Sequence, residues 1–213
     1  MSGLPRASVL FPEQFEQAAV ALGRAFVRDP ALMAILPESE APEAADRIKR
    51  ITEVFRAALA VQRREGEPVL GVMDDGRVAG AAVVAGGGAA SVWTLLAFGL
   101  PYLPRMINAV GWGGTKRALQ LTDTLARNHP PERHIYLNFL GVDPDHQGKH
   151  YGIALLDCLR DLAQARSDLA GVYLETATEA NVPYYSSHGY KVIGEMYPLG
   201  VKFWRMFQYK NTQ

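Results

Sequence analysis

The sequence predicts an α/β fold: a mixed, mostly antiparallel sheet of about seven strands with helices on both faces. Two observations predict it. First, strand-length apolar runs alternate with runs whose apolar residues recur every three or four positions, as in amphipathic helices. Second, hairpin patterns lie near both ends of the chain. Helices that alternate with strands cover both faces of a sheet, and hairpins add antiparallel neighbours.

The composition is typical of a single domain formed by residues 1–213. Hydrophobic residues make up 48% of the chain, enough for a core, and the formal net charge is zero. A neutral chain has no broad electrostatic attraction to nucleic acid or acidic membrane. The single cysteine, Cys158, excludes an intrachain disulfide, and no His, Cys or carboxylate spacing indicates a metal site. We therefore expect no nucleic-acid partner, no membrane partner and no metal.

Residues 78–104 carry no charged side chain and are long enough to cross a bilayer. Several glycines and two prolines interrupt the stretch, and its first part follows the Asp75-Gly76 turn as a hairpin strand would. The start of the chain has no apolar segment of the length that a secretory signal needs. We expect a cytoplasmic protein, either a monomer or a homodimer.

The expected elements follow in chain order. The expected strands are residues 7–10, 68–73, 77–85, 136–142, 172–178, 190–196 and 201–208. The expected helices are residues 15–26, 31–36, one that begins at Pro42-Glu43, one that leads from the turn at 147–152 to about residue 166, and 181–188. The helix after Pro42 has a charged face that contains Arg47, and we expect this face to be exposed to solvent.

Residues 89–130 are expected to form a helical insertion between the third and fourth strands. Two helices, 93–108 and 115–128, are separated there by the sequence Gly-Trp-Gly-Gly at 111–114. The insertion is rich in aromatic residues: Trp93, Phe98, Tyr102 and Trp112. These rings either line a pocket for a substrate or pack the insertion itself, and the sequence leaves both possibilities open.

The region from Tyr136 to Leu156 predicts an anion site. An apolar strand is followed by a turn around Pro144 and then by a helix whose leucines recur at spacings of three and four. The first amides of a helix lack carbonyl partners and carry the positive end of the helix dipole. Gly148 and Gly152 would let a phosphate approach the backbone. The pattern predicts a diphosphate site at residues 147–152, although glycines near a helix start also serve as simple turn residues.

Residues 147–152 resemble the acyl-CoA signature of the GCN5-related N-acetyltransferase (GNAT) superfamily, Gln/Arg-x-x-Gly-x-Gly/Ala after a strand. Gln147 and Gly152 match this signature, whereas His150 stands where the family has its first glycine. A histidine there narrows the approach to the phosphates and costs more than glycine if its φ is positive. It would either weaken CoA binding or add a contact from its ring.

A second segment resembles the same family. The strand VYLETAT at 172–178 is followed by Asn181, the pair Tyr184-Tyr185, and Gly189-Tyr190. In the family's later motif, an Asn and an aromatic-Tyr pair likewise precede a Gly-aromatic pair. The insertion and the run Pro183-Tyr184-Tyr185 are also similar to the acetyltransferases that modify aminonucleoside antibiotics such as puromycin.

The resemblance implies acetyl-CoA as cosubstrate and assigns residues to it. The backbone at Leu140 and Val142 would pair with pantetheine, and the Val142 amide would stabilise the developing oxyanion. Asn181 would bind the pantetheine arm. The diphosphate would be held by the turn and the start of the helix: Gln147, Gly148, Lys149, His150, Tyr151 and Gly152.

The resemblance also implies a general acid. Tyr185 matches the family's tyrosine that protonates the CoA thiolate, a step that a phenol can perform. Tyr185 could instead be a packed aromatic residue, with Tyr184 as the alternative acid. Many members have a base glutamate at the position of Tyr136, so that role cannot be carried over. We take Glu175 as the base, because burial would raise its pKa, while a structural role for it stays open.

These assignments predict an N-acetyltransferase that moves an acetyl group from acetyl-CoA directly to the amine of a small molecule. An aromatic or apolar amine suits a neutral protein better than a polycation does. His134 and His188 are expected to be surface or packing residues. The alternative function is a non-catalytic acyl-CoA-binding sensor or interaction module, in which His150 and the missing strand glutamate reflect lost catalysis.

Overall fold

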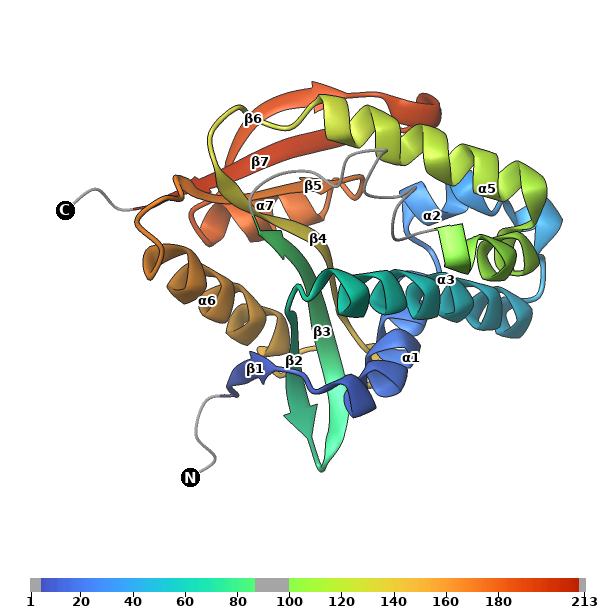
Figure 1. Ribbon diagram of the computed structural model, residues 1–213, viewed down its shortest axis with the longest axis horizontal. Coiled ribbons are helices and arrows are strands. Elements are labelled where there is room, and N and C mark those ends of the chain that lie inside the picture. Colours follow the sequence, from blue (N-terminus) through green and yellow to red (C-terminus); the bar gives the residue numbers. More distant parts are fainter. Residues whose placement is uncertain (1–4, 87–99, 211–213) are drawn as a thin grey trace.

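The computed structural model describes residues 5–86 and 100–210 and contains a seven-stranded sheet (Figure 1). The strands are β1 (Ala7–Val9), β2 (Val69–Asp74), β3 (Arg77–Gly86), β4 (His134–Val142), β5 (Gly171–Thr176), β6 (Lys191–Met196) and β7 (Phe203–Tyr209). Their order is β1-β2-β3-β4-β5-β7-β6, and all neighbours are antiparallel except β4 and β5, which are parallel. This confirms the predicted mixed, mostly antiparallel sheet.

Helices cover both faces of this sheet. The α-helices described are α1 (Phe15–Ala25), α2 (Pro30–Ile35), α3 (Ala44–Glu65), α5 (Leu103–Arg127), α6 (Tyr151–Gln164) and α7 (Asn181–Ser187). Short 3-10 helices lie at Pro12–Gln14, Glu38–Glu40, Leu100–Tyr102, Pro144–His146 and Pro198–Gly200. Helix α1 packs on β3 and β4, α3 packs on α1, and α5 packs on α3, whereas α6 lies on the opposite face (Figure 1).

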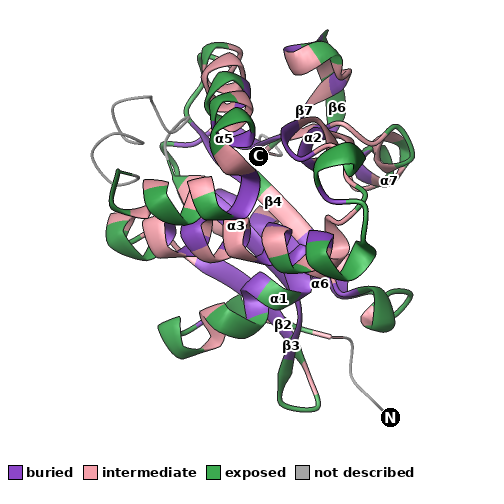
Figure 2. Ribbon diagram, turned by 90° about the vertical axis from the view of Figure 1, so that its right-hand side faces the viewer, coloured by how far each residue is buried: buried purple, intermediate pink, exposed green. Residues whose placement is uncertain are grey.

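The core has one part on each face of the sheet. On the α1 and α3 face, the rings of Phe26, Phe55 and Phe139 meet with centroids 5.1–5.8 Å apart. On the other face, apolar residues of α6, such as Leu155 and Leu159, pack against the sheet and are fully buried. Figure 2 shows the buried residues gathered on the strands and on the helix sides that face them. The core divides in this way because α1 and α3 turn their apolar sides to one face of the sheet and α6 turns its apolar side to the other.

Strand β4 contains a bulge that changes which residues face each side. Val83 of β3 is opposite Phe139 and Val84 is opposite Leu137, so Asn138 is an extra residue in β4. Before the bulge, Leu137 packs on the α6 side. After it, Phe139 packs on the α1 side, where strict alternation would have placed Asn138.

The predicted insertion contains two helical segments that meet at Gly111. The φ and ψ of Gly111, 69° and 174°, are not helical, so α5 breaks there as the Gly-Trp-Gly-Gly sequence predicted. The part of the first predicted helix before residue 100 lies outside the described residues. Trp93 and Phe98 lie outside the described residues, and Trp112 is 73% exposed. The prediction that the charged face of α3 is exposed is wrong for Arg47, which is buried. Its guanidinium donates to the carbonyls of Val27 and Leu36, which lie on either side of α2.

Within residues 5–86 and 100–210, no helix has the length and apolar character needed to cross a membrane.

Candidate active site

Strands β4 and β5 part beyond their shared register. Their parallel pairing runs only from His134 and Gly171 to Leu137 and Leu174. From there β4 continues against β3 as far as Val142, and β5 continues against β7 as far as Thr176. The end of β4 that carries the predicted residues Leu140 and Val142 therefore has no partner on β5. An extended ligand could pair with such a strand edge.

The turn after β4 leads into α6 through two residues with positive φ. Gly148 has φ 79°, and His150, the residue that caps the N-terminus of α6, has φ 63° and ψ 16°. His150 therefore adopts the left-handed backbone conformation that costs a residue with a Cβ more than it costs glycine. The His150 side chain makes no capping hydrogen bond, so it leaves the first amides of α6 to another acceptor. Such a helix start suits a diphosphate group, and the predicted residues 147–152 all lie in this turn or the first turn of α6.

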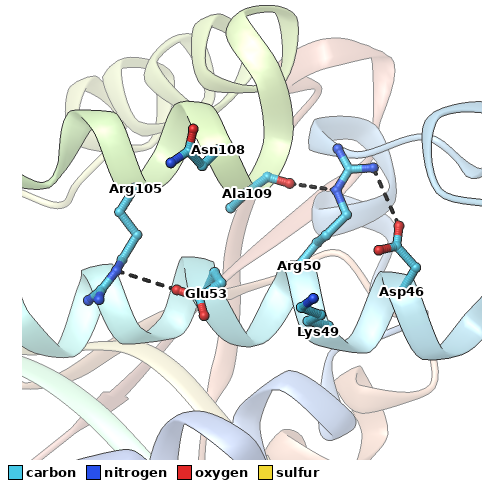
Figure 3. A pocket seen from close by; sticks show the side chains of 7 residues that line it. All are labelled: Asp46, Lys49, Arg50, Glu53, Arg105, Asn108 and Ala109. Carbon is cyan, nitrogen blue, oxygen red and sulfur yellow. Dashed lines mark hydrogen bonds and ion pairs between the residues drawn. The ribbon is translucent and has the colours of Figure 1, made fainter.

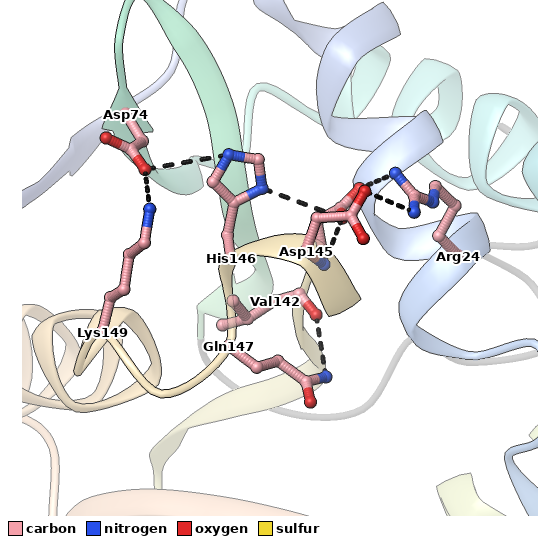
Figure 4. A network of polar contacts seen from close by, with 8 residues as sticks. Arg24, Asp74, Val142, Asp145, His146, Gln147 and Lys149 are labelled. Atoms are coloured by element: carbon pink, nitrogen blue, oxygen red, sulfur yellow. Dashed lines mark hydrogen bonds and ion pairs between the residues drawn. The ribbon is translucent and has the colours of Figure 1, made fainter.

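Ion pairs from α1 hold the turn in place (Figure 4). Arg24 of α1 reaches Asp143 Oδ2 at 3.1 Å and Asp145 Oδ2 at 2.8 Å. Asp143 is buried, and its other oxygen accepts a hydrogen bond from the Asp145 amide at 2.9 Å. A buried carboxylate that has a cation and a backbone donor fixes the loop strongly. The turn is thus positioned by the N-terminal part of the chain.

Lys149 and Gln147 have protein partners in this structure. Lys149 Nζ lies 2.8 Å from Asp74 Oδ2 at the end of β2, as Figure 4 shows. The hydrogen bond from Lys149 lowers the pKa of Asp74. The Gln147 side chain donates to the Val142 carbonyl at 3.3 Å. For Lys149 to contact a diphosphate, its ammonium would have to exchange Asp74 for phosphate or bridge the two.

Tyr184 and Tyr185 of α7 have different surroundings. A Cβ at Gly152 would lie 2.8 Å from the Tyr184 hydroxyl oxygen, so this hydroxyl sits against the first turn of α6 and glycine makes room for it. Tyr185 is buried in the core cluster that includes Leu155, with its ring 5.7 Å from that of Tyr190. Burial raises the pKa of the Tyr185 phenol, so it stays protonated at neutral pH.

Asn181, the first residue of α7, is held at the end of β5. Its side-chain amide donates to Thr176 Oγ1 at 3.4 Å. Thr176 is the last residue of β5, beyond the point where β4 leaves it. Asn181 therefore lies beside the end of β5 that does not pair with β4, and its contact with the pantetheine arm stays a prediction.

Glu175 lies on the same parted end of β5 and is deeply buried. Its side chain is 3% exposed, and Oε1 has no hydrogen-bond partner among the residues that the structure describes. Burial raises the pKa of Glu175 to about 7, against the opposing effects of the Tyr173 and Tyr136 hydroxyls and of Arg205. A carboxyl group that titrates near neutral pH is suited to accept a proton.

His129 is a neighbour of Glu175 that the sequence did not reveal. His129 Nε2 lies 3.7 Å from Glu175 Oε1, and His129 Nδ1 lies 3.1 Å from His134 Nε2. His134 Nδ1 is 2.6 Å from the Glu132 carbonyl oxygen. Burial lowers the pKa of His129 to about 4 and also lowers that of His134. No spacing signal links His129 to Glu175, since His129 lies in the connection after α5.

A recess of about 620 Å³ lies elsewhere, between α3 and α5 (Figure 3). Its charged side chains pair across it: Arg105 Nε is 3.4 Å from Glu53 Oε2, and Arg50 Nε donates to the Ala109 carbonyl at 2.6 Å. No predicted site residue lines this recess. Among the described residues, no group of His, Cys, Asp or Glu side chains could hold a metal ion.

The chain is similar to known acetyltransferases in sequence and in fold. The model of the acetyltransferase (GNAT) family matches residues 31–190, more than half of the chain. A solved structure from Corynebacterium glutamicum, described as histone acetyltransferase HPA2 and related acetyltransferase, superposes with a TM-score of 0.69 at 18% identity, covering 99% of both chains.

Two animal enzymes share the fold. The Drosophila melanogaster polyamine N-acetyltransferase, which forms N-acetylagmatine, has a TM-score of 0.62 at 14% identity, covering 95% of this chain and 98% of its own. Arylalkylamine N-acetyltransferase 2 from Aedes aegypti has a TM-score of 0.63 at 13% identity, covering 98% of this chain and 100% of its own. The chain therefore belongs to the acetyltransferase (GNAT) family and is an acetyl-CoA-dependent N-acetyltransferase.

Proposed function

We propose that this enzyme transfers the acetyl group directly to the amine of a small molecule, at the opening between β4 and β5. One observation carries the proposal. Four features lie around the place where β4 and β5 part. They are the open start of α6, the end of β4 that has no partner on β5, Asn181 and the buried Glu175. A donor bound there would have an anion site at one end and a proton acceptor at the other.

The donor would be held mainly by backbone groups. The amides of the turn at 147–152 and of the first turn of α6 would bind the diphosphate. The free edge of β4 at Leu140 and Val142 would pair with pantetheine, with Asn181 holding the arm from the other side. The Val142 amide would stabilise negative charge on the thioester oxygen. These roles follow the family motif and the positions described above.

Two side chains would move protons. Glu175 would take a proton from the substrate ammonium, which breaks an N–H bond, forms an O–H bond and leaves the amine lone pair free to attack the thioester carbon. Tyr185 would give its phenol proton to the leaving sulfur as the carbon–sulfur bond breaks, and it would regain a proton from the acylated nitrogen, whose second N–H bond breaks as the amide forms. A small amine is supported by the polyamine and arylalkylamine substrates named for two structural neighbours, and a formal net charge of zero favours an aromatic or apolar one over a polycation.

The experiment is an acceptor panel that follows release of free CoA thiol from acetyl-CoA. The panel contains arylalkylamines, aliphatic polyamines, aminonucleosides and a lysine peptide, with isothermal titration of CoA in parallel. We expect turnover above the hydrolysis background with at least one small amine, and most with an aromatic amine. Turnover with the peptide alone, or CoA binding without turnover on any small amine, would contradict the proposed acceptor class.

A further inference from the structure

Glu175 and His129 present two buried polar atoms to each other. Glu175 Oε1 and His129 Nε2 are 3.7 Å apart, and the two side chains are 3% and 8% exposed. Neither atom has a hydrogen-bond partner among the described residues. Buried polar atoms without partners are rare in folded proteins, and such atoms call for an explanation. Here each atom is the nearest available partner of the other.

The hydrogen-bond chain behind His129 determines which of its nitrogens carries a proton. The Glu132 carbonyl can only accept, so His134 Nδ1 must be the donor in their 2.6 Å contact. A neutral His134 then has a bare Nε2, which accepts from His129 Nδ1 at 3.1 Å. A neutral His129 in turn has a bare Nε2, and this lone pair is directed toward Glu175.

An ionised Glu175 and this bare nitrogen would place two acceptors against each other. A proton on the carboxyl group removes the conflict, because the new hydroxyl donates to Nε2. We propose that His129 completes the catalytic base: held in one tautomer by His134 and the Glu132 carbonyl, it accepts the hydrogen bond of Glu175 once Glu175 has taken the proton of the amine. This inference rests on the proposed role of Glu175 as the base.

The proton balance is simple. One N–H bond of the substrate ammonium breaks, one O–H bond forms on Glu175, and that O–H donates to His129 Nε2 without transferring its proton. The carboxyl group later returns the proton to solvent. His129 is a positioning residue, because it acts on the amine only through Glu175.

Other groups face the carboxyl group from three strands: Tyr173 of β5, Tyr136 of β4 and Arg205 of β7. The two phenols can donate to the carboxylate and the guanidinium is a cation, so all three lower the pKa of Glu175 and favour its ionised form. Among these described neighbours, His129 Nε2 is the acceptor that carries no proton of its own, whereas a phenol oxygen can accept from the protonated form only if its own proton turns away. Burial and the His129 acceptor favour the protonated form of Glu175 and so oppose the effect of these three groups. The carboxyl group therefore titrates near neutral pH.

The test measures protonation directly and does not depend on turnover. Histidines labelled with ¹⁵N report the tautomer, and glutamates labelled at Cδ with ¹³C report the titration of Glu175. His129→Ala, His134→Ala and Glu175→Gln variants assign the signals. We expect His129 to be neutral and protonated at Nδ1 from pH 5 to 8, His134 to be protonated at Nδ1, and Glu175 to titrate near pH 7. A His129 signal protonated at Nε2, or a cationic His129 at pH 6, would overturn the inference even if Glu175 is the base.

Two substitutions then distinguish an effect of the histidines on the pKa of Glu175 from a role in packing alone. His129→Phe keeps an aromatic ring against Tyr136 but removes the acceptor, so Glu175 should titrate about one pH unit lower. His134→Phe lets His129 place its proton on Nε2, which should lower the titration similarly. His134→Gln, whose amide oxygen can accept from His129, should restore it.

The rise of kcat/KM with pH should follow the same shifts while KM for acetyl-CoA is unchanged. A Glu175 titration that stays in place in both phenylalanine variants would show that the histidines only pack. If the titrations shift as expected but kcat/KM does not follow them, the geometry stands and the proposed role of Glu175 as the base fails instead.

Discussion

Tyr184 and Tyr185 are adjacent residues with different surroundings, and this separates their expected roles. The Tyr184 hydroxyl lies against Gly152 at the start of α6, whereas Tyr185 is packed in the core and its phenol is kept protonated by burial. If Tyr185 is the acid, Tyr185→Phe should lower kcat by roughly 10²-fold and leave acetyl-CoA binding unchanged. Stopped-flow turnover together with titration calorimetry measures both quantities.

Tyr184→Phe is the matched control, since it removes a hydroxyl from the neighbouring ring. We expect it to change acetyl-CoA affinity more than kcat, because its hydroxyl is close to the expected diphosphate site. A large loss of kcat in Tyr184→Phe together with an unaffected Tyr185→Phe would reverse the two assignments.

Residues within a motif were predictable from the sequence, whereas their distant neighbours were not. The family motif assigned Asn181 to the pantetheine arm, which stays a prediction, and the structure holds its side chain at the end of β5. Burial raises the pKa of Glu175, as predicted, but the contact with His129 was not predicted. That contact joins the connection after α5 to β5, and a pattern with helical or strand period carries no signal for a partner so far along the chain.

At the scale of elements, the start of α6 combines an anion site with a strained residue. His150 has φ 63°, a conformation that a residue with a Cβ adopts at a cost. His150→Gly should therefore bind CoA at least as tightly as the unmodified chain and raise the free energy of unfolding by up to ~1 kcal/mol. Calorimetry with CoA and chemical denaturation measure the two effects.

His150→Ala distinguishes the backbone from the ring. It keeps the Cβ and the strained φ but lacks the imidazole. If the ring only crowds the phosphates, alanine should bind CoA as tightly as glycine does. Weaker binding by both variants would show that the imidazole contributes a contact, contrary to our expectation.

The turn before α6 offers a second pair of substitutions. Asp143 and Asp145 share Arg24 as a partner, but their side chains are 9% and 69% exposed. Asp143→Asn should lower the free energy of unfolding by about 1–3 kcal/mol, because Arg24 and the loop amide lose a buried charged acceptor. Asp145→Asn should change it by less than about 1 kcal/mol, since water screens an exposed pair.

Thermal and chemical denaturation would measure both variants, and CoA titration would show whether the turn must be fixed for binding. Equal effects of the two substitutions would mean that burial of Asp143 does not decide the stability of the turn.

The order of elements was predictable because each has its own period, but the contacts between distant elements were not. The helices after Pro42 and after the 147–152 turn were expected from their apolar spacing, and the structure contains both. The break inside α5 was also expected, because a Gly-Trp-Gly-Gly sequence has little helical preference, and Gly111 has a non-helical φ and ψ of 69° and 174°. Arg47 was misjudged because carbonyls outside its helix surround it.

At the scale of the whole molecule, Glu175 and His129 should contribute opposite pH dependences to stability. The unfolded chain releases the Glu175 proton near pH 4.5 and the folded chain near pH 7. The stability that Glu175 contributes through this pKa shift is therefore full below pH 4.5 and is lost as the pH rises toward 7. The unfolded chain gains the His129 proton near 6.5 and the folded chain near 4, so this contribution is full above 6.5 and is lost as pH falls toward 4.

Between pH 4.5 and 6.5 the two slopes should cancel in the unmodified chain. Relative to it, the free energy of unfolding of Glu175→Gln should rise with pH by about 1.4 kcal/mol per unit in this window, and that of His129→Phe should fall with pH. Urea denaturation at several pH values measures this. Parallel pH curves for the three proteins would contradict the buried protonation states of the pair.

The sheet as a whole was the most predictable level of structure. Seven apolar runs and the turns between them defined the strands, and their alternation with helices favoured the mixed sheet that the structure contains. The parting of β4 and β5 could not be derived from strand periodicity, because pairing is a relation between two segments. Only the resemblance to a family pointed to it, by implying that the backbone at Leu140 and Val142 pairs with pantetheine.

The extra residue Asn138 affects how this chain should be aligned with its relatives. Positions in the first half of β4 are assigned by counting back from the turn, and this count includes Asn138. A relative with an unbroken strand there would have one residue fewer, and an ungapped alignment would then match a side chain on one face of its sheet with a side chain on the other face here. The correspondence between Tyr136 and the glutamate of other members should therefore be checked by superposition rather than by counting.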